Sequence, residues 1–167
     1  MRALQLRPLT AEAFAPYGDV VEPPEPGGRH GLSSSIGSPS LGSPSQGSQG
    51  AGTSARLSFS NKPPSVLPLV ATEMERHPWS SQTFVPLDVS RWVVMVAPDL
   101  GGRPDPDRLC AFVVRGDQAV NYYVGTWHHP LHVLDRPGRF AVLMWTTGRK
   151  QDDETWSALP EPVRLVE

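Results

Sequence analysis

The chain of 167 residues contains a single cysteine, Cys110, so it has no internal disulfide. A protein that uses so little cysteine is typical of a reducing compartment, and we expect a cytoplasmic location. No apolar run is long enough to cross a bilayer as a helix. The opening residues MRALQLRPLT lack the apolar core of a signal peptide. These absences predict a protein that makes no use of a membrane.

Runs of like charge are also missing. The 15 basic and 17 acidic residues give a formal net charge of −2, and they are spread along the chain. Nothing therefore suggests a groove for nucleic acid or an attraction to an anionic membrane surface. The sequence has no GxGxxG pattern, no phosphate-binding P-loop and no GxSxG nucleophile elbow. We expect no organic cofactor and a small molecule as the ligand.

Proline and glycine are abundant, at 19 and 15 residues, which favours short strands and turns over long helices. One short helix is predicted at residues 11–17, capped by Thr10 and ended by Gly18, with a strand after it. Residues 23–52 differ from the rest because Pro, Gly and Ser supply 21 of the 30 positions. Such a segment buries too little apolar surface to offset its ordering, so we predict a flexible, low-complexity insertion.

The remaining sequence is rich in Val, Phe, Trp and Tyr and is interrupted by turn-forming residues. Parallel strands would need crossover helices between them, and the sequence has no room for these. We therefore predict one mainly β domain over residues 1–167, an antiparallel barrel or sandwich. The predicted strands are 56–61, 68–77, 82–87, 91–97, 109–115, 118–124, 129–134 and 139–145.

Side-chain alternation along two of these strands gathers polar groups. Glu75 and His77 lie two residues apart and so share a face. The stretch GTWHHPLHV (125–133) holds three of the five histidines. In a regular strand His128 and His132 share a face and His129 points the other way, unless Pro130 interrupts the ladder. Two such strands can build a site inside a small barrel, although each histidine alone could equally be structural.

Two segments resemble the ureidoglycolate lyase family: MERHPWSSQTFVPLD (74–88) and RGDQAVNYYVGTWHHPLHVL (115–134). The opening LTAEAFAPYGDVVE and the stretch GRPDPDRLCAFVV are also similar to that family. The resemblance implies a cupin-like β-barrel, that is a double-stranded β-helix with few short helices, and a homodimer. It implies an amidine-lyase type enzyme that releases glyoxylate and urea from ureidoglycolate in allantoin (purine) degradation.

The resemblance also implies a site. His77 and His128 fall where cupins carry metal ligands, so they would act on the substrate directly or through a divalent metal of the nickel or zinc kind. Glu75 would be a third ligand or would orient an imidazole. Histidines suit the proton transfers of this reaction, with His128 the first choice and His129 the second. The candidate substrate-binding residues are Gln82, Asn121, Tyr123, Arg56 and Lys62.

Two departures from the family pattern keep other functions open. An Asn-Gln-Gly-Thr-Ala-like stretch of the family reads GAGTSAR (50–56) here, without the Asn, and LMWTTGRKQDDETW (143–156) replaces an Asp-Arg pair. The alternatives are a small-molecule-binding cupin without catalytic activity and another metal-dependent cupin enzyme, such as an isomerase or oxygenase.

Overall fold

A computed structural model of the chain describes residues 1–31, 36–37 and 53–167. Within these residues the chain forms thirteen strands, two four-residue helices and one 3-10 turn at Pro106–Arg108. The helices are α1 (Ala11–Phe14) and α2 (Lys150–Asp153). The strands are β1 (Arg2–Gln5), β2 (Arg7–Pro8), β3 (Gly18–Val21), β4 (Ser54–Lys62), β5 (Leu69–Arg76), β6 (Gln82–Pro86), β7 (Arg91–Ala97), β8 (Cys110–Arg115), β9 (Ala119–Tyr122), β10 (Trp127–His128), β11 (His132–Leu134), β12 (Gly138–Thr146) and β13 (Thr155–Val166). Neither helix has the length that crossing a membrane would need, as far as the described residues go.

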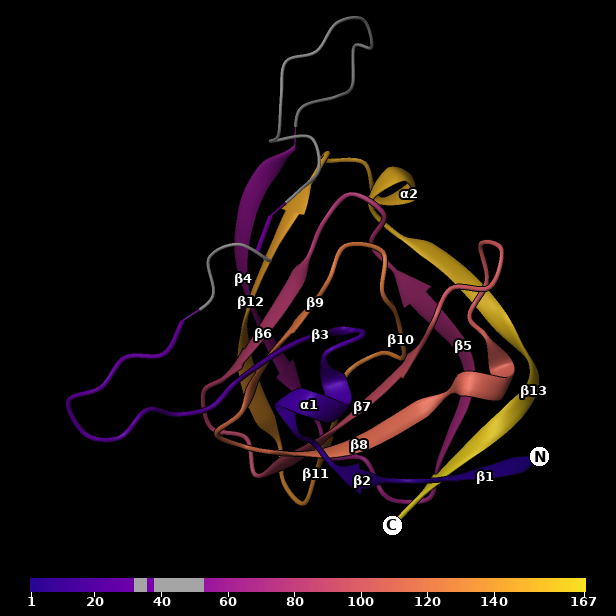
Figure 1. Ribbon diagram of the computed structural model, residues 1–167, viewed down its shortest axis with the longest axis horizontal. Coiled ribbons are helices and arrows are strands. Elements are labelled where there is room, and N and C mark those ends of the chain that lie inside the picture. Colours follow the sequence, from indigo (N-terminus) through magenta and orange to yellow (C-terminus); the bar gives the residue numbers. More distant parts are fainter. Residues whose placement is uncertain (32–35, 38–52) are drawn as a thin grey trace, which may run out of the picture.

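The strands form two sheets that face each other and make a nearly closed barrel (Figure 1). One sheet has the order β1-β13-β5-β10-β7-β8-β2, with β11 also paired to β7; the other has the order β3-β9-β6-β12-β4. Among the strands that the structure describes, the short pairs β1–β13 and β2–β8 are parallel and the others antiparallel. The predicted mainly β, antiparallel barrel is confirmed.

Most of the predicted strands occur within a few residues of their expected bounds, and Thr10 caps α1 as expected. The predicted strand 129–134 is wrong, because the chain leaves the ladder between β10 and β11. The long strand β13 was not predicted from the sequence. Its pairing with β5 is interrupted by a bulge between Ala158 and Val163, where two prolines make the sequence look like a turn.

Apolar side chains cover both faces of the sheet at β7. Trp92, Val94 and Val96 face the interior with the aromatic residues of the opposite sheet. Val93 and Met95 face the other side and pack in a second cluster with Trp127. Because both faces are covered, β7 reads in the sequence as a continuous hydrophobic run rather than an alternating one.

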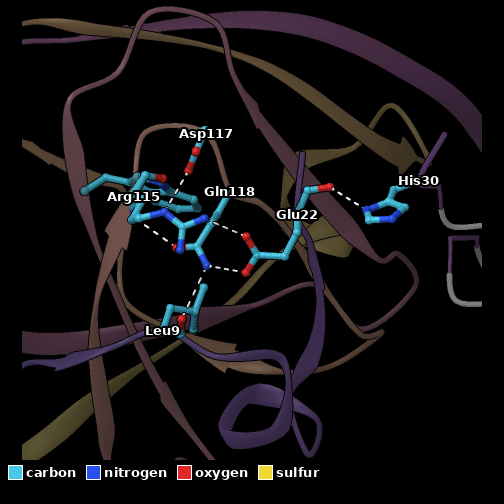
Figure 2. A network of polar contacts seen from close by, with 7 residues as sticks. Leu9, Glu22, His30, Arg115, Asp117 and Gln118 are labelled. Carbon is cyan, nitrogen blue, oxygen red and sulfur yellow. Dashed lines mark hydrogen bonds and ion pairs between the residues drawn. The ribbon is translucent and has the colours of Figure 1, made fainter. Parts of the chain in front are cut away.

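A buried amide fastens the start of the chain to the barrel (Figure 2). Gln118 is fully buried; its Nε2 donates to Glu22 Oε1 at 2.7 Å and to the carbonyl of Leu9 at 3.3 Å. Its Oε1 accepts from the backbone of Arg115 at 3.0 Å, and the Arg115 guanidinium binds Glu22 at 2.7 Å. A glutamine in the family-like motif thus has a structural role, holding β3 against the β8–β9 turn.

The predicted flexible insertion at 23–52 lies in large part outside the described residues, which omit 32–35 and 38–52. In its described part, His30 is exposed and its Nδ1 donates to the carbonyl of Glu22 at 2.8 Å (Figure 2). Gly37 exchanges two hydrogen bonds of 2.9 Å with Ser81. Ser81 precedes β6, so this part of the segment reaches the strand that carries Gln82.

Candidate active site

Strand register places two rows of side chains opposite each other inside the barrel. In the five-stranded sheet Arg56, Met144, Gln82 and Tyr122 are successive partners across β4, β12, β6 and β9. In the larger sheet Glu75, His128 and Val96 are partners across β5, β10 and β7. Side chains of directly paired residues project from the same face of a sheet. The register therefore carries polar groups from five strands to one level of the barrel.

Glu75, His77 and His128 form the polar centre of this level. One ligand-type atom from each lies within 4.8 Å of the others. The rings of His77 and His128 have centroids 5.3 Å apart, and Glu75 Oε1 lies 3.5 Å from His128 Nε2. Both imidazoles are buried. The expected closeness of the two rings, and of a carboxylate to them, is confirmed.

Backbone carbonyls set the orientation of both rings. His77 Nδ1 bonds the carbonyl of Asp153 at 3.0 Å, and His128 Nδ1 bonds the carbonyl of Thr126 at 2.9 Å. A carbonyl only accepts, so each Nδ1 carries a proton, and in the neutral form of each ring Nε2 is the acceptor. Tyr122 stacks on His128, with centroids 4.3 Å apart and planes 11° apart. These contacts aim the Nε2 atoms at Glu75.

Three polar atoms of the cluster have no hydrogen-bond partner among the described residues. They are His77 Nε2, His128 Nε2 and Gln82 Oε1, and all three are buried. Buried acceptors without partners cost free energy, so a fold keeps them where a ligand completes them. Two neutral imidazoles and one carboxylate at this spacing are also a donor set that divalent transition metals accept. The residues therefore fit a divalent cation as well as a small polar substrate.

The pKa values of two groups in the cluster move in the directions that keep His77 neutral and the carboxylate of Glu75 charged. Burial lowers the pKa of His77, and the neighbouring His128 lowers it further. Burial raises the pKa of Glu75, but the neighbouring histidines, above all His128, outweigh it, so the pKa of Glu75 lies below its usual value. Near neutral pH the centre thus combines a carboxylate with a neutral His77.

The turn before β10 brings the two histidine strands together. Gly125 adopts φ +78°, a left-handed conformation that favours glycine, and its amide donates to the carbonyl of His77 at 2.9 Å. Beyond His128 the chain bulges: His128 pairs with Val96 of β7, but His132 pairs with Val93, so the pairing slips by one residue.

This slip turns His132 away from the cluster. A change of one residue in register moves a side chain to the other face of the sheet. The expectation that His128 and His132 share a face is therefore wrong, and Pro130 lies inside the interruption. His129 faces outward as expected; its Nδ1 donates to the carbonyl of Glu73 at 3.0 Å, and its ring stacks on that of His132 at 5.1 Å. His129, a candidate for proton transfer, is thus not brought to the cluster.

A cavity of about 450 Å³ opens beside the cluster. Of the residues proposed from the sequence, it is lined by Arg56, Glu75, His77 and Gln82. The sequence analysis missed the other lining residues, which come from β12 and the segment after it: Met144, Thr146, Gly148, Lys150, Asp153 and Glu154. The signal that could have found them is the departure from the family pattern at 143–156, which marks this segment as particular to this chain.

Three predicted substrate-binding residues do not reach the cavity. Asn121 and Tyr123 project from β9 on the opposite side from Tyr122, and both bind the carboxylate of Asp19, at 3.1 and 2.9 Å. Asn121 also accepts from Thr83 at 2.8 Å. Lys62 is at the far end of β4 from Arg56, where its charge acts on His132. In these positions the side chains of Asn121 and Tyr123 hydrogen-bond to neighbouring strands and stabilise the sheet.

Known proteins are similar to the chain over most of its length. A family model described as ureidoglycolate lyase matches residues 1–165. Proteins named ureidoglycolate lyase are similar to the chain: one from Burkholderia mallei (strain NCTC 10229) is 36% identical over 170 residues, covering 100% of this chain and 95% of its own length. One from Agrobacterium fabrum (strain C58) is 40% identical over 141 residues, covering 83% of this chain and 82% of its own length. The crystal structure of a dTDP sugar isomerase from Desulfovibrio desulfuricans G20 has a TM-score of 0.46 at 19% identity, covering 86% and 82% of the two chains.

Proposed function

Because the chain belongs to the ureidoglycolate lyase family, we propose that it cleaves ureidoglycolate to glyoxylate and urea, as an amidine-lyase type enzyme of allantoin degradation. The observation that carries the proposal is the cluster of Glu75, His77 and His128. The Nε2 atoms of its two histidines have no partner, and the cluster lies beside a cavity lined also by Arg56 and Gln82. The cluster and the cavity beside it together hold the groups that this reaction needs.

The reaction breaks the bond between the carbinol carbon and the ureido nitrogen. The hydroxyl must lose its proton as the carbonyl of glyoxylate forms, and the nitrogen must gain one as urea leaves. An unprotonated imidazole can take the first proton and return it to the nitrogen, so that one group balances both transfers. His128 suits this role because its Nε2 is an acceptor facing Glu75, which would stabilise the imidazolium formed in between.

Substrate binding would use the opposite sheet. Arg56 lines the cavity and, among the described residues, forms no ion pair, so its guanidinium is available for the substrate carboxylate. Lys150 also lines the cavity but pairs with Glu154 at 3.2 Å. Gln82 has an unpartnered Oε1 that can accept from the ureido NH groups.

The same centre would hold a divalent cation of the nickel or zinc kind. His77 and His128 would bind it through Nε2 and Glu75 through its carboxylate; His128 would then act through the cation, as the alternative to taking the proton itself. Such a cation would supply Lewis-acid polarisation of the substrate oxygens. The contacts of Arg56 and Gln82 with the substrate would be the same with or without it.

The direct test is to incubate the purified protein with ureidoglycolate and to measure glyoxylate and urea, before and after treatment with a chelator. Ureidoacetate, which lacks the hydroxyl, serves as the matched control, because it can bind but cannot react. Equal release of both products supports the proposal. Binding of ureidoacetate without turnover of ureidoglycolate would contradict it and favour a binding protein.

We also propose that the protein is a homodimer that pairs through the outer face of β4. Because Arg56 points inward, its neighbours Leu57 and Phe59 point outward, where they are 67% and 76% exposed. The register continues this face from Phe59 through Ala141 of β12 to Val85 of β6. Large exposed apolar side chains on an edge strand are typical of contact surfaces.

A further inference from the structure

The segment between β12 and β13 closes one side of the cavity and contains helix α2. Figure 1 shows α2 beyond the C-terminal end of β5, which is the end that leads to His77. A helix of four residues has no stability of its own. Other interactions must therefore hold this segment in place beside the cluster.

The carboxylate of Asp153 provides those interactions. Its Oδ1 accepts hydrogen bonds from the backbone amide and the hydroxyl of Thr147, both at 2.7 Å. Its Oδ2 accepts from the hydroxyl of Thr146. That hydroxyl in turn accepts from the amide of Gly148 at 2.9 Å, in a turn where glycine has φ +81°. The last residue of α2 is thus tied to the end of β12.

The same residue contacts the cluster through its backbone. The Asp153 carbonyl accepts from His77 Nδ1 at 3.0 Å. The two buried histidines therefore differ in how they are held. His128 donates to Thr126, two residues earlier in the same chain segment, whereas His77 depends on a carbonyl 76 positions away. Displacement of the α2 segment would free the ring of His77 and leave that of His128 unchanged.

We propose that Asp153 is a positioning residue: its carboxylate fixes the α2 segment so that its carbonyl selects the Nδ1-protonated tautomer of His77 and turns Nε2 toward Glu75 and His128. The inference rests on the active site proposed above, but it concerns the histidine itself and not the reaction. Hydrogen-bond partners that orient a ligand histidine commonly change metal affinity or activity by about 10- to 100-fold.

The tautomer of His77 is the decisive measurement, made by nitrogen-15 NMR of the imidazoles in the protein without added metal. We expect one Nδ1-protonated form in the wild type and a mixture in Asp153→Ala, with His128 unchanged as an internal reference. Asp152→Ala is the matched control, because that carboxylate lies on the same helix and pairs with Arg149 at 2.7 Å. It should leave His77 unchanged.

Thr147→Val removes the hydroxyl that donates to Asp153 Oδ1 and retains Asp153 itself, so it replaces Asp153→Ala if that variant does not fold. We expect it to shift His77 in the same direction. A single Nδ1-protonated His77 in both variants, or an equal change in Asp152→Ala, would overturn the proposal.

Calorimetric titration with Zn²⁺ gives a second readout. Affinity should fall by about 10- to 100-fold in Asp153→Ala and by less than about twofold in Asp152→Ala. A wild type that does not bind Zn²⁺ would refute the metal site, while the tautomer would still decide the role of Asp153. Glyoxylate release by the wild type decides the lyase reaction separately.

Discussion

Replacing either of two histidines in one short stretch should separate catalysis from stability. His128 and His132 each make one Nδ1 hydrogen bond of 2.9 Å, to the Thr126 carbonyl and to Ser65 Oγ, and each stacks on one neighbouring ring. They differ in the face of the sheet that they occupy. His128→Ala and His132→Ala therefore remove similar interactions, but only the first removes a group from the cavity side.

The magnitudes follow from these contacts. A lost hydrogen bond costs about 1 kcal/mol and a lost ring contact about 0.5–1.5 kcal/mol, so each variant should lose about 2 kcal/mol of stability. For a chain of this size the melting temperature falls by about 2–4 °C per kcal/mol, or about 4–8 °C. Most of a typical stability of about 5–15 kcal/mol remains, and both variants stay folded at 25 °C. Loss of a general acid or base should lower kcat by about 10²- to 10⁴-fold in His128→Ala alone.

The assay measures glyoxylate release at 25 °C with saturating ureidoglycolate, alongside thermal unfolding of the same samples. His132→Ala should retain turnover within about twofold, because it touches nothing in the cavity. Comparable turnover losses in the two variants would refute the reasoning, since the difference between the faces would then have no catalytic meaning. Retention of more than about a tenth of kcat in His128→Ala would remove that residue from the proton transfers.

Three further changes have definite expected outcomes. Burial, with the charges of His129 and Lys62, lowers the pKa of His132 to about 4. The unfolded state therefore binds a proton near pH 6.5 that the folded state does not bind, and the free energy of unfolding falls as the pH drops from about 6.5 to 4. In urea unfolding, His132→Ala should lose less stability than the wild type between pH 7 and 5. Arg56→Gln should raise KM for ureidoglycolate by about 10-fold or more with little change in kcat, as expected for a lost charge-assisted hydrogen bond, while Lys62→Gln leaves KM unchanged; equal effects would show that Arg56 does not bind the carboxylate. Phe59→Lys should convert a dimer to a monomer in light scattering after gel filtration, whereas Leu100→Lys, also on an exposed apolar residue, should not; a dimer that survives Phe59→Lys places the interface elsewhere.

The barrel and the pair of Glu75 with His77 could be predicted because both depend on local alternation. Two residues apart on a regular strand share a face whatever the rest of the fold does. The position of His128 near this pair could also be predicted, because the family resemblance implies that His128 occupies a ligand position inside the barrel. The family resemblance supplied the pairing of these strands, which the alternation pattern of a single strand does not contain.

The errors occur where alternation is interrupted. The prediction placed His132 on the wrong face because one extra residue between β10 and β11 inverts the alternation. Pro130 indicated that the strand could be interrupted there, but not by how many residues. Asn121 and Tyr123 lie on the correct strand, but the face of β9 that meets the cavity is that of Tyr122. Lys150 and Asp153 reach the cavity from the four-residue helix α2, which is too short to show a periodicity in the sequence.

The one-residue slip after His128 has a consequence for how this protein can change over time. Because the strip from His128 to His132 presents His128 to one side of the sheet and His129 and His132 to the other, substitutions at His129 and His132 alter the outer surface while the cluster keeps His128. The two surfaces can therefore vary independently, although they are encoded within five residues. Insertion or deletion of one residue here would exchange the two faces of the strand. A different imidazole would then face the cluster, and the present one would face the outer surface. Substitutions at His129 and His132 are thus mild events, whereas length changes in this strip are drastic ones.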